Sequence, residues 1–161
     1  MNEEIKRQYR VCFTGHRPEK LKVPEAQVKS SLQKEICQAI ADGLTVFITG
    51  MARGVDIWAA EIVIQLRNAG EPIKLMCACP YDGFEKSWSQ DWKDRYNAIL
   101  EQADHTVYIC KHYSKSCFQI RNEWMVDHSA RVIAVFNGER GGTKNTIDYA
   151  KRKSIECRII E

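Results

Sequence analysis

The stretch that decides the fold is Leu44–Glu61, LTVFITGMARGVDIWAAE. It begins with an apolar run rich in β-branched and aromatic residues, breaks at Thr49–Gly54, and resumes as a helix-like run from Val55. This order predicts a buried strand, a tight glycine loop and a buried helix. Such a loop points backbone N–H groups and a helix N-terminus at one place beyond the strand end, where anions, and phosphate above all, are favoured.

Four residues of this stretch suit an anion site. Gly50 and Gly54 let the backbone turn sharply and approach a ligand closely. Arg53 offers a fork of donors for phosphate or carboxylate, and Asp56 lies in the first turn of the expected helix, where it can also accept from ligand hydroxyls. A strand–glycine loop–helix junction is a weak motif, so the alternative stays open that Asp56 only caps the helix and Arg53 only pairs with a surface acid.

Length and composition indicate one ordinary globular domain spanning residues 1–161. The chain is 44% apolar and 28% charged, and 24 Lys and Arg against 21 Asp and Glu give a net charge of +3, which is too small to indicate nucleic acid by itself. No apolar run approaches a membrane span, and residues 1–7 lack the apolar core of a secretion signal. We therefore expect a cytoplasmic protein without a membrane partner.

Cysteine and histidine usage excludes several classes of chemistry. The seven cysteines are odd in number and form no CxxC pair, so reduced core thiols are expected. The four histidines have no nucleophile motif near them, and no metal motif appears. No cofactor, no metal site and no Ser/His/Asp or Cys/His catalytic centre is therefore predicted.

The whole chain alternates between strand-like and helix-like runs. Strands are expected at 9–13, 44–48, 73–79, 105–110, 131–136 and 155–160. Helices are expected at 24–42, 55–68, 117–130 and 144–153, and the segment 84–102 has helical spacing from Trp92 on. This alternation predicts an α/β fold with a mostly parallel sheet covered by helices on both faces. In the run 84–102, Trp88 and Trp92 are four residues apart, which favours burial of a helix face over the wall of a pocket.

Three glycine turns follow expected strands, at Thr14–Gly15, Thr49–Gly50 and Gly141–Gly142–Thr143. Ligands of such sheets lie beyond the carboxyl ends of the strands, near the point where the strand order reverses. Because the carboxyl ends of parallel strands share one edge, all three turns are expected on the ligand edge.

The first turn adds polar and basic groups to that edge. Thr14 and Gly15 offer a hydroxyl and backbone donors, and Pro18 holds Arg17 extended. His16 and Arg17 suit contact with an anion or stacking on a base, although an exposed turn residue is an equal alternative for His16.

These motifs resemble a known family. The run 14–18, TGHRP, followed by 49–56, TGMARGVD, and 58–61, WAAE, is similar to the YpsA-like proteins of the SLOG superfamily over nearly the whole chain. The resemblance implies a Rossmann-like three-layer fold. The superfamily includes the LOG phosphoribohydrolases, which release a base from nucleoside monophosphates, and the DNA-processing protein A family, which binds single-stranded DNA.

The resemblance also implies a ligand and the residues that hold it. It implies a nucleotide or nucleotide-derived molecule, such as one of the ADP-ribose type. Gly50, Arg53, Gly54 and Asp56 match the shared loop, and Gly141–Thr143 resemble the GGxGT phosphate turn of the phosphoribohydrolases.

The enzymatic part of the resemblance is incomplete. Arg121 resembles the helical catalytic arginine of the phosphoribohydrolases and is the one weak catalytic candidate, but their catalytic glutamate aligns with Thr146, and Asp148 comes two positions late. Cleavage of a glycosidic bond through an oxocarbenium-like state wants a carboxylate near the ribose. That carboxylate would have to come from Glu61, Asp56, Asp148 or Glu123.

Three functions follow from the sequence. The leading one is a binding or sensor domain for a nucleotide-derived small molecule, and the second is an N-glycosidic hydrolase of phosphoribohydrolase type. The third is a single-stranded nucleic-acid module, for which Tyr113, His16 and Trp88 are the stacking candidates. A homo-oligomer is left open.

Overall fold

The computed structural model describes residues 2–161 and confirms the α/β fold. Its single sheet has six strands in the order β4-β3-β2-β1-β5-β6, and every adjacent pair is parallel. The strands are β1 (Arg10–Gly15), β2 (Val46–Thr49), β3 (Lys74–Cys79), β4 (His105–Tyr108), β5 (Arg131–Val135) and β6 (Glu156–Ile160). The helices are α1 (Glu3–Arg7), α2 (Glu25–Ala41), α3 (Val55–Asn68), α4 (Gln90–Gln102), α5 (Cys117–Asp127) and α6 (Gly142–Arg152), with a 3₁₀ turn η1 at Pro18–Lys20.

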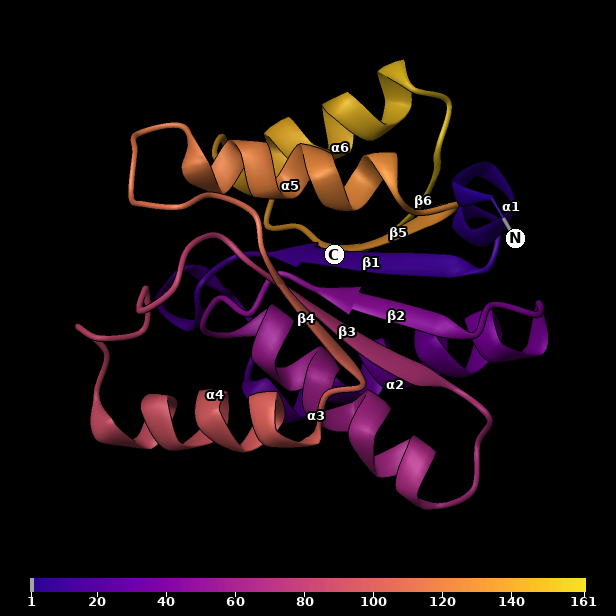
Figure 1. The fold of residues 1–161 in the computed structure, drawn as a ribbon, viewed down its shortest axis with the longest axis horizontal. Coiled ribbons are helices and arrows are strands. Elements are labelled where there is room, and N and C mark those ends of the chain that lie inside the picture. The colour runs from indigo at the N-terminus through magenta and orange to yellow at the C-terminus, as the bar shows by residue number, and fades with distance from the viewer. Residues whose placement is uncertain (1) are drawn as a thin grey trace.

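The elements form three layers. Helices α2, α3 and α4 cover one face of the sheet, and α5 and α6 cover the other (Figure 1). Each face buries its own apolar cluster: Phe13, Phe47 and Leu75 belong to the first, and Cys12, Ile48 and Val132 to the second. Neighbouring strand residues therefore alternate between the two clusters, as the pleat of a sheet covered on both faces requires.

Helix α3 occupies the centre of its layer. It packs between α2 and α4 and against β1, β2 and β3. This position explains its composition, because residues 55–60 are all buried, on every side of the helix. By contrast, α2 buries only the stripe that includes Val28, Leu32 and Ile36.

The observed bounds differ from the sequence-based ones by one to three residues at the ends of most elements. Thr14 and Gly15 complete strand β1, and Gly142 and Thr143 lie in the first turn of α6, so neither pair forms a separate turn. Helix α4 begins at Gln90, two residues before the helical spacing that starts at Trp92, and the preceding segment with Trp88 forms turns whose aromatic rings pack against one another. Helix α1 was not predicted, since its five residues bury nothing.

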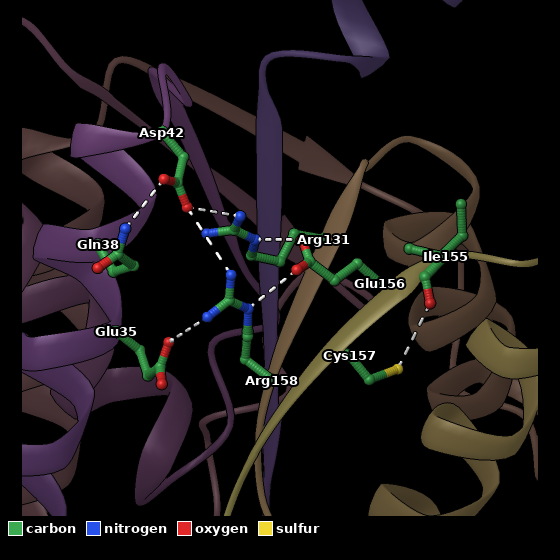
Figure 2. A network of polar contacts seen from close by, with 8 residues as sticks. All are labelled: Glu35, Gln38, Asp42, Arg131, Ile155, Glu156, Cys157 and Arg158. Atoms are coloured by element: carbon green, nitrogen blue, oxygen red, sulfur yellow. Dashed lines mark hydrogen bonds and ion pairs between the residues drawn. The ribbon is translucent and has the colours of Figure 1, made fainter.

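An ion-pair network fastens the amino ends of β5 and β6 to the end of α2 (Figure 2). Arg131 donates from Nη2 to Asp42 Oδ2 at 2.7 Å and from Nε to Glu156 Oε1 at 2.6 Å. Arg158 donates to Glu156 Oε2 at 2.9 Å and lies 3.9 Å from Glu35. The network lies at the strand edge opposite the predicted ligand edge, which indicates a structural role.

The cysteines agree with the expectation of free thiols. All seven are unpaired; Cys12, Cys77, Cys79 and Cys117 are buried. Within residues 2–161, no helix combines the length and apolar character needed to cross a membrane.

Candidate functional site

The strand order reverses between β1 and β5, and a cavity of about 200 Å³ lies at the carboxyl ends of these strands. We call it the switch-point cavity. It is lined by three loop regions and the first turns of α3, α5 and α6, through Thr14, Gly15, His16, Arg17, Lys20, Ala52, Asp56, Phe118, Arg121, Asn122, Arg140, Gly141, Gly142 and Thr143. This is the place where open parallel sheets bind their ligands.

The N-terminus of α6 forms one wall of the cavity. The capping residue Gly141 has φ 145°, a backbone conformation that favours glycine, and it supplies no side chain to cap the helix. The first backbone bond of the helix runs from Asn145 N–H to the Gly141 carbonyl at 3.0 Å, so the N–H groups of residues 142–144 have no helical acceptor. Uncapped N–H groups at a helix N-terminus favour an anion.

Asp56, in the first turn of α3, is the one acid that lines the cavity among residues 2–161. Its Oδ2 accepts from Ala52 N–H at 3.2 Å, whereas its Oδ1 is buried without a hydrogen-bond partner in that part of the chain. Burial raises the pKa of Asp56 to about 6, against the opposing effects of Arg121 and the Ala52 N–H. The loop before it holds Met51 at φ 65°, a strained conformation of the kind that clusters at functional sites.

Arg121, from the second turn of α5, faces Asp56 across Gly50. Its Nη1 donates to the Gly50 carbonyl, and its Nε donates to Asn122 Oδ1 at 2.8 Å. Burial lowers the pKa of Arg121, and the Asp56 carboxylate works against that shift. A Cβ on Gly50 would lie 2.9 Å from Asp56 Oδ2 and 3.0 Å from Arg121 Cζ, so only glycine fits between them without displacing either.

His16, the residue after β1, is buried. The side chain is 8% exposed, stacks on Phe136, and accepts the Asn137 N–H at Nε2 over 3.1 Å. The alternative of an exposed turn residue is therefore wrong, and burial lowers the pKa of His16. Gly15 serves close packing, because a Cβ there would lie 2.4 Å from Val55 Cγ2.

The structure brings together most, though not all, of the predicted site residues. Thr14, Gly15, His16, Arg17, Asp56, Arg121, Gly141, Gly142 and Thr143 line the switch-point cavity, whereas Gly50, Arg53 and Gly54 do not. Gly50 and Gly54 lie just behind its wall, and Gly54 has φ 91° and packs against the His16 carbonyl. Arg53 pairs with Glu19 at 3.0 Å, as the alternative reading of a surface ion pair expected.

Five lining residues were not among the predicted ones: Lys20, Ala52, Phe118, Asn122 and Arg140. A signal existed for two of them. Phe118 comes three residues before Arg121, which places both on one side of a helix, and Arg140 directly precedes the third glycine turn. Lys20 lies in η1, and the sequence did not predict this 3₁₀ turn because none of its residues is buried.

The other carboxylates named for a hydrolase lie outside the cavity. Glu61 pairs with Arg95 at 2.6 Å, Glu123 accepts from Gln119 at 2.9 Å, and Asp148 pairs with Lys144 at 2.8 Å. Thr146, which aligns with the catalytic glutamate of the phosphoribohydrolases, donates its hydroxyl to the Gly142 carbonyl at 2.7 Å.

The fold and the cavity define a Rossmann-like α/β protein with a cationic cavity at the topological switch point. Comparison with known proteins then places it in a family. A family model described as YspA SLOG family matches residues 11–160, and the chain belongs to this YpsA-like SLOG family, as the sequence motifs predicted.

Individual relatives agree with this placement. The chain is 30% identical over 152 residues to the UPF0398 proteins of Bacillus thuringiensis strain Al Hakam and Bacillus cereus strain B4264, covering 89% of this chain and 83% of each relative. Among solved structures it is similar to DNA processing protein A of Helicobacter pylori, with TM-score 0.69, 17% identity, 99% of this chain and 67% of that chain. The same protein from Streptococcus pneumoniae gives TM-score 0.69 at 20% identity over 53% of its chain. At these identities, the structural likeness shows the fold alone.

Proposed function

We propose that the switch-point cavity binds the phosphate-bearing part of a nucleotide-derived ligand and that the protein is a binding or sensor domain for it. One observation carries the proposal: four cationic side chains, Arg17, Lys20, Arg121 and Arg140, line the same small cavity as the uncapped N-terminus of α6. Backbone N–H groups, a helix dipole and guanidinium forks all favour phosphate.

Asp56 gives the proposed site a second specificity. An ionised carboxylate only accepts hydrogen bonds, so its unpartnered Oδ1 suits a ligand hydroxyl and repels a second phosphate. A ribose phosphate combines both features, with an anionic group for the α6 side of the cavity and hydroxyls for Asp56.

Thermal unfolding with a ligand panel tests the proposal. The panel contains AMP, ADP, ATP, NAD, ADP-ribose and a short single-stranded oligonucleotide. A ligand at a hundred times its Kd stabilises by about 2.7 kcal/mol, which corresponds to a Tm increase of roughly 5–10 °C for a domain of this size.

Two charge variants show whether a shift arises in the cavity. Arg140→Gln removes an exposed charge that lines it, and Arg152→Gln removes an exposed charge at the far end of α6. We expect the first variant to lose most of the shift and the second to keep it. Equal shifts in both variants, or no shift with any member of the panel, would refute the proposal.

A second candidate function is binding of single-stranded DNA. The observation that favours it is the shared fold with the Helicobacter pylori protein, whose structure is described by its single-stranded DNA binding mode. Phosphate contacts make such binding strongly salt-dependent. Oligonucleotide binding that falls steeply between low and physiological salt, with no response to mononucleotides, would favour this function over the first.

A further inference from the structure

A second and larger cavity, of about 830 Å³, adjoins the switch-point cavity and shares Arg17, Ala52 and Phe118 with it. We call it the aromatic cavity, because Tyr81, Phe84, Trp88, Trp92 and Phe118 line it. We propose that it holds the planar base of the ligand, so that the ligand class is an aromatic-base nucleotide and not a sugar phosphate. This inference rests on the proposed function above.

The sizes of the two cavities support a ligand that spans both. Pockets for small molecules commonly measure about 300–1,000 Å³. The switch-point cavity, at about 200 Å³, falls below that range and offers room for a phosphate and part of a sugar. The rest of a nucleotide would therefore extend beyond the switch-point cavity, and the boundary that the two cavities share at Arg17 and Phe118 leads into the aromatic cavity.

The aromatic cavity has the lining that a base requires. Its rings pack against one another. The ring centroids of Phe84 and Trp88 lie 5.0 Å apart in an edge-to-face arrangement, and those of Phe118 and Tyr81 lie 6.3 Å apart. Phe118 is still 38% exposed although it belongs to this cluster. A pre-ordered, part-exposed ring at the boundary of a phosphate site offers a stacking surface that costs little further ordering when a base binds.

Polar groups around the rings supply partners for the edge of a base. Ser87 and Ser89 line the same cavity. Arg53 lines it too, and within residues 2–161 the hydrogen bond of its guanidinium runs from Nη2 to Glu19 Oε1. A cavity with few convergent polar groups on aromatic walls is typical of sites for planar ligands. Arg53, one of the predicted phosphate residues that does not reach the switch-point cavity, would thus contact the base side of the ligand.

Calorimetric titration with AMP and with ribose 5-phosphate tests the inference, because the two probes differ only in the base. We expect AMP to bind the wild-type protein about tenfold or more tightly, the factor that one stacked base supplies. In Phe118→Ala and Phe118→Leu, the ratio of the two dissociation constants is expected to fall to about two or less. Phe118→Leu keeps the apolar volume in case Phe118→Ala unfolds, and Ile120→Ala, an exposed residue of the same helix that lines neither cavity, is expected to keep the wild-type ratio.

Each other result decides against the inference. Equal affinity for the two probes would place the base outside the aromatic cavity while leaving phosphate binding intact. A large ratio that survives both Phe118 variants would assign the base to another surface. Failure of both probes to bind would remove this inference, and it would remove the proposed function as well if no member of the ligand panel shifts the Tm.

Discussion

At Asp56, the demands of stability and of the proposed ligand binding are opposed. Asp56 is 6% exposed, its Oδ1 has no hydrogen-bond partner within residues 2–161, and the nearby Arg121 donates to the Gly50 carbonyl. The pKa of about 6 lies above the ordinary value of 3.8, so the folded state holds the proton more tightly than the unfolded state does. Ionised Asp56 thus destabilises the fold at neutral pH, a common cost of a functional group.

The pH dependence of stability follows from this sign. The contribution of Asp56 is fully present below about pH 3.8 and is lost as the pH rises through about 6, a difference of about 3 kcal/mol. Asp56→Asn stays neutral throughout, so we expect the free energy of unfolding of the wild type to fall relative to this variant between pH 4 and 7. Urea unfolding of both proteins across that range measures the difference, and AMP affinity of the wild type should rise over the same interval.

A matched control excludes a general effect of removing a carboxylate. Glu101→Gln removes an exposed carboxylate of α4, outside both cavities, and should follow the wild-type pH profile. The comparison also cancels the contribution of His16, whose lowered pKa acts in the opposite direction and favours the fold above its ordinary pKa. Parallel profiles for the wild type and Asp56→Asn would show that Asp56 ionises freely.

At single positions, the sequence predicted the chemical character of a residue better than it predicted which other residues that residue contacts. It placed Asp56 in the first turn of one helix and Arg121 on another helix, because residue type and glycine spacing are local features. It could not show that His16 is buried, because the group that donates to it, Asn137 N–H, follows β5, far along the chain. It also could not show that Arg53 turns toward Glu19.

Among the elements, β5 and β6 are joined to α2 by ion pairs from two arginines, and Arg131 is the more buried of the two (Figure 2). The Arg131 side chain is 8% exposed and bonds Asp42 and Glu156, whereas the Arg158 side chain is 36% exposed. We expect Arg131→Met to destabilise the protein by about 1–3 kcal/mol, because two charge-assisted bonds are lost. Arg158→Met, the same change at an exposed member of the network, should cost about 1 kcal/mol or less.

Acid unfolding gives this prediction a second measurement. The hydrogen bond from Arg131 lowers the pKa of Asp42 below its ordinary value, so the pair stabilises the fold above about pH 3.8 and is lost as the pH falls through the lower folded value. The acid midpoint of Arg131→Met should therefore move to higher pH. Equal loss of stability in the two arginine variants would contradict a special role for the buried one.

The pattern of elements was predictable, and their ends were not. All six strands and the five longer helices followed from apolar periodicity, which the burial of both sheet faces imposes on the sequence. The helical spacing from Trp92 on placed the start of α4 to within two residues, whereas the four-residue spacing of Trp88 and Trp92 is misleading, because Trp88 lies in a turn and packs against Phe84 and Tyr96. Tertiary packing of aromatic rings overrides local spacing there.

For the whole molecule, the switch-point cavity lies between the helix layers of the two sheet faces, at the carboxyl ends of β1 and β5. One wall comes from the α3 side of the sheet, and the other comes from the α5 and α6 side. A ligand that contacts both walls should slow amide exchange on each. With saturating AMP, we expect hydrogen–deuterium exchange to slow in segments 52–56 and 141–144 and to stay unchanged in 156–158, at the network edge. Protection of one wall alone would contradict a bridging ligand.

The fold as a whole was predictable because its rules are general. Strand–helix alternation with short connections leaves few arrangements other than a covered parallel sheet, and the position of the site follows from the strand order. The aromatic cavity was predictable only in part. Trp88 and Trp92 do line it, as the less favoured alternative of a pocket wall expected, but Phe118 comes from α5, which only the folded chain brings to them.

The pairing of β1 with β5 sets the order in which the parts of the sheet can fold. During synthesis, β1 to β4 and their helices can assemble as they leave the ribosome, since each of these strands pairs with its predecessor in the chain. One edge of β1 stays open until β5 arrives, and an open strand edge invites wrong pairing. Because α6 follows β5 in the chain, the α6 wall of the cavity forms after the other wall, and only a chain that already includes α6 can bind the proposed ligand. A ligand present in the cell would therefore stabilise newly made chains in the state in which β5 and α6 have docked on the rest of the fold.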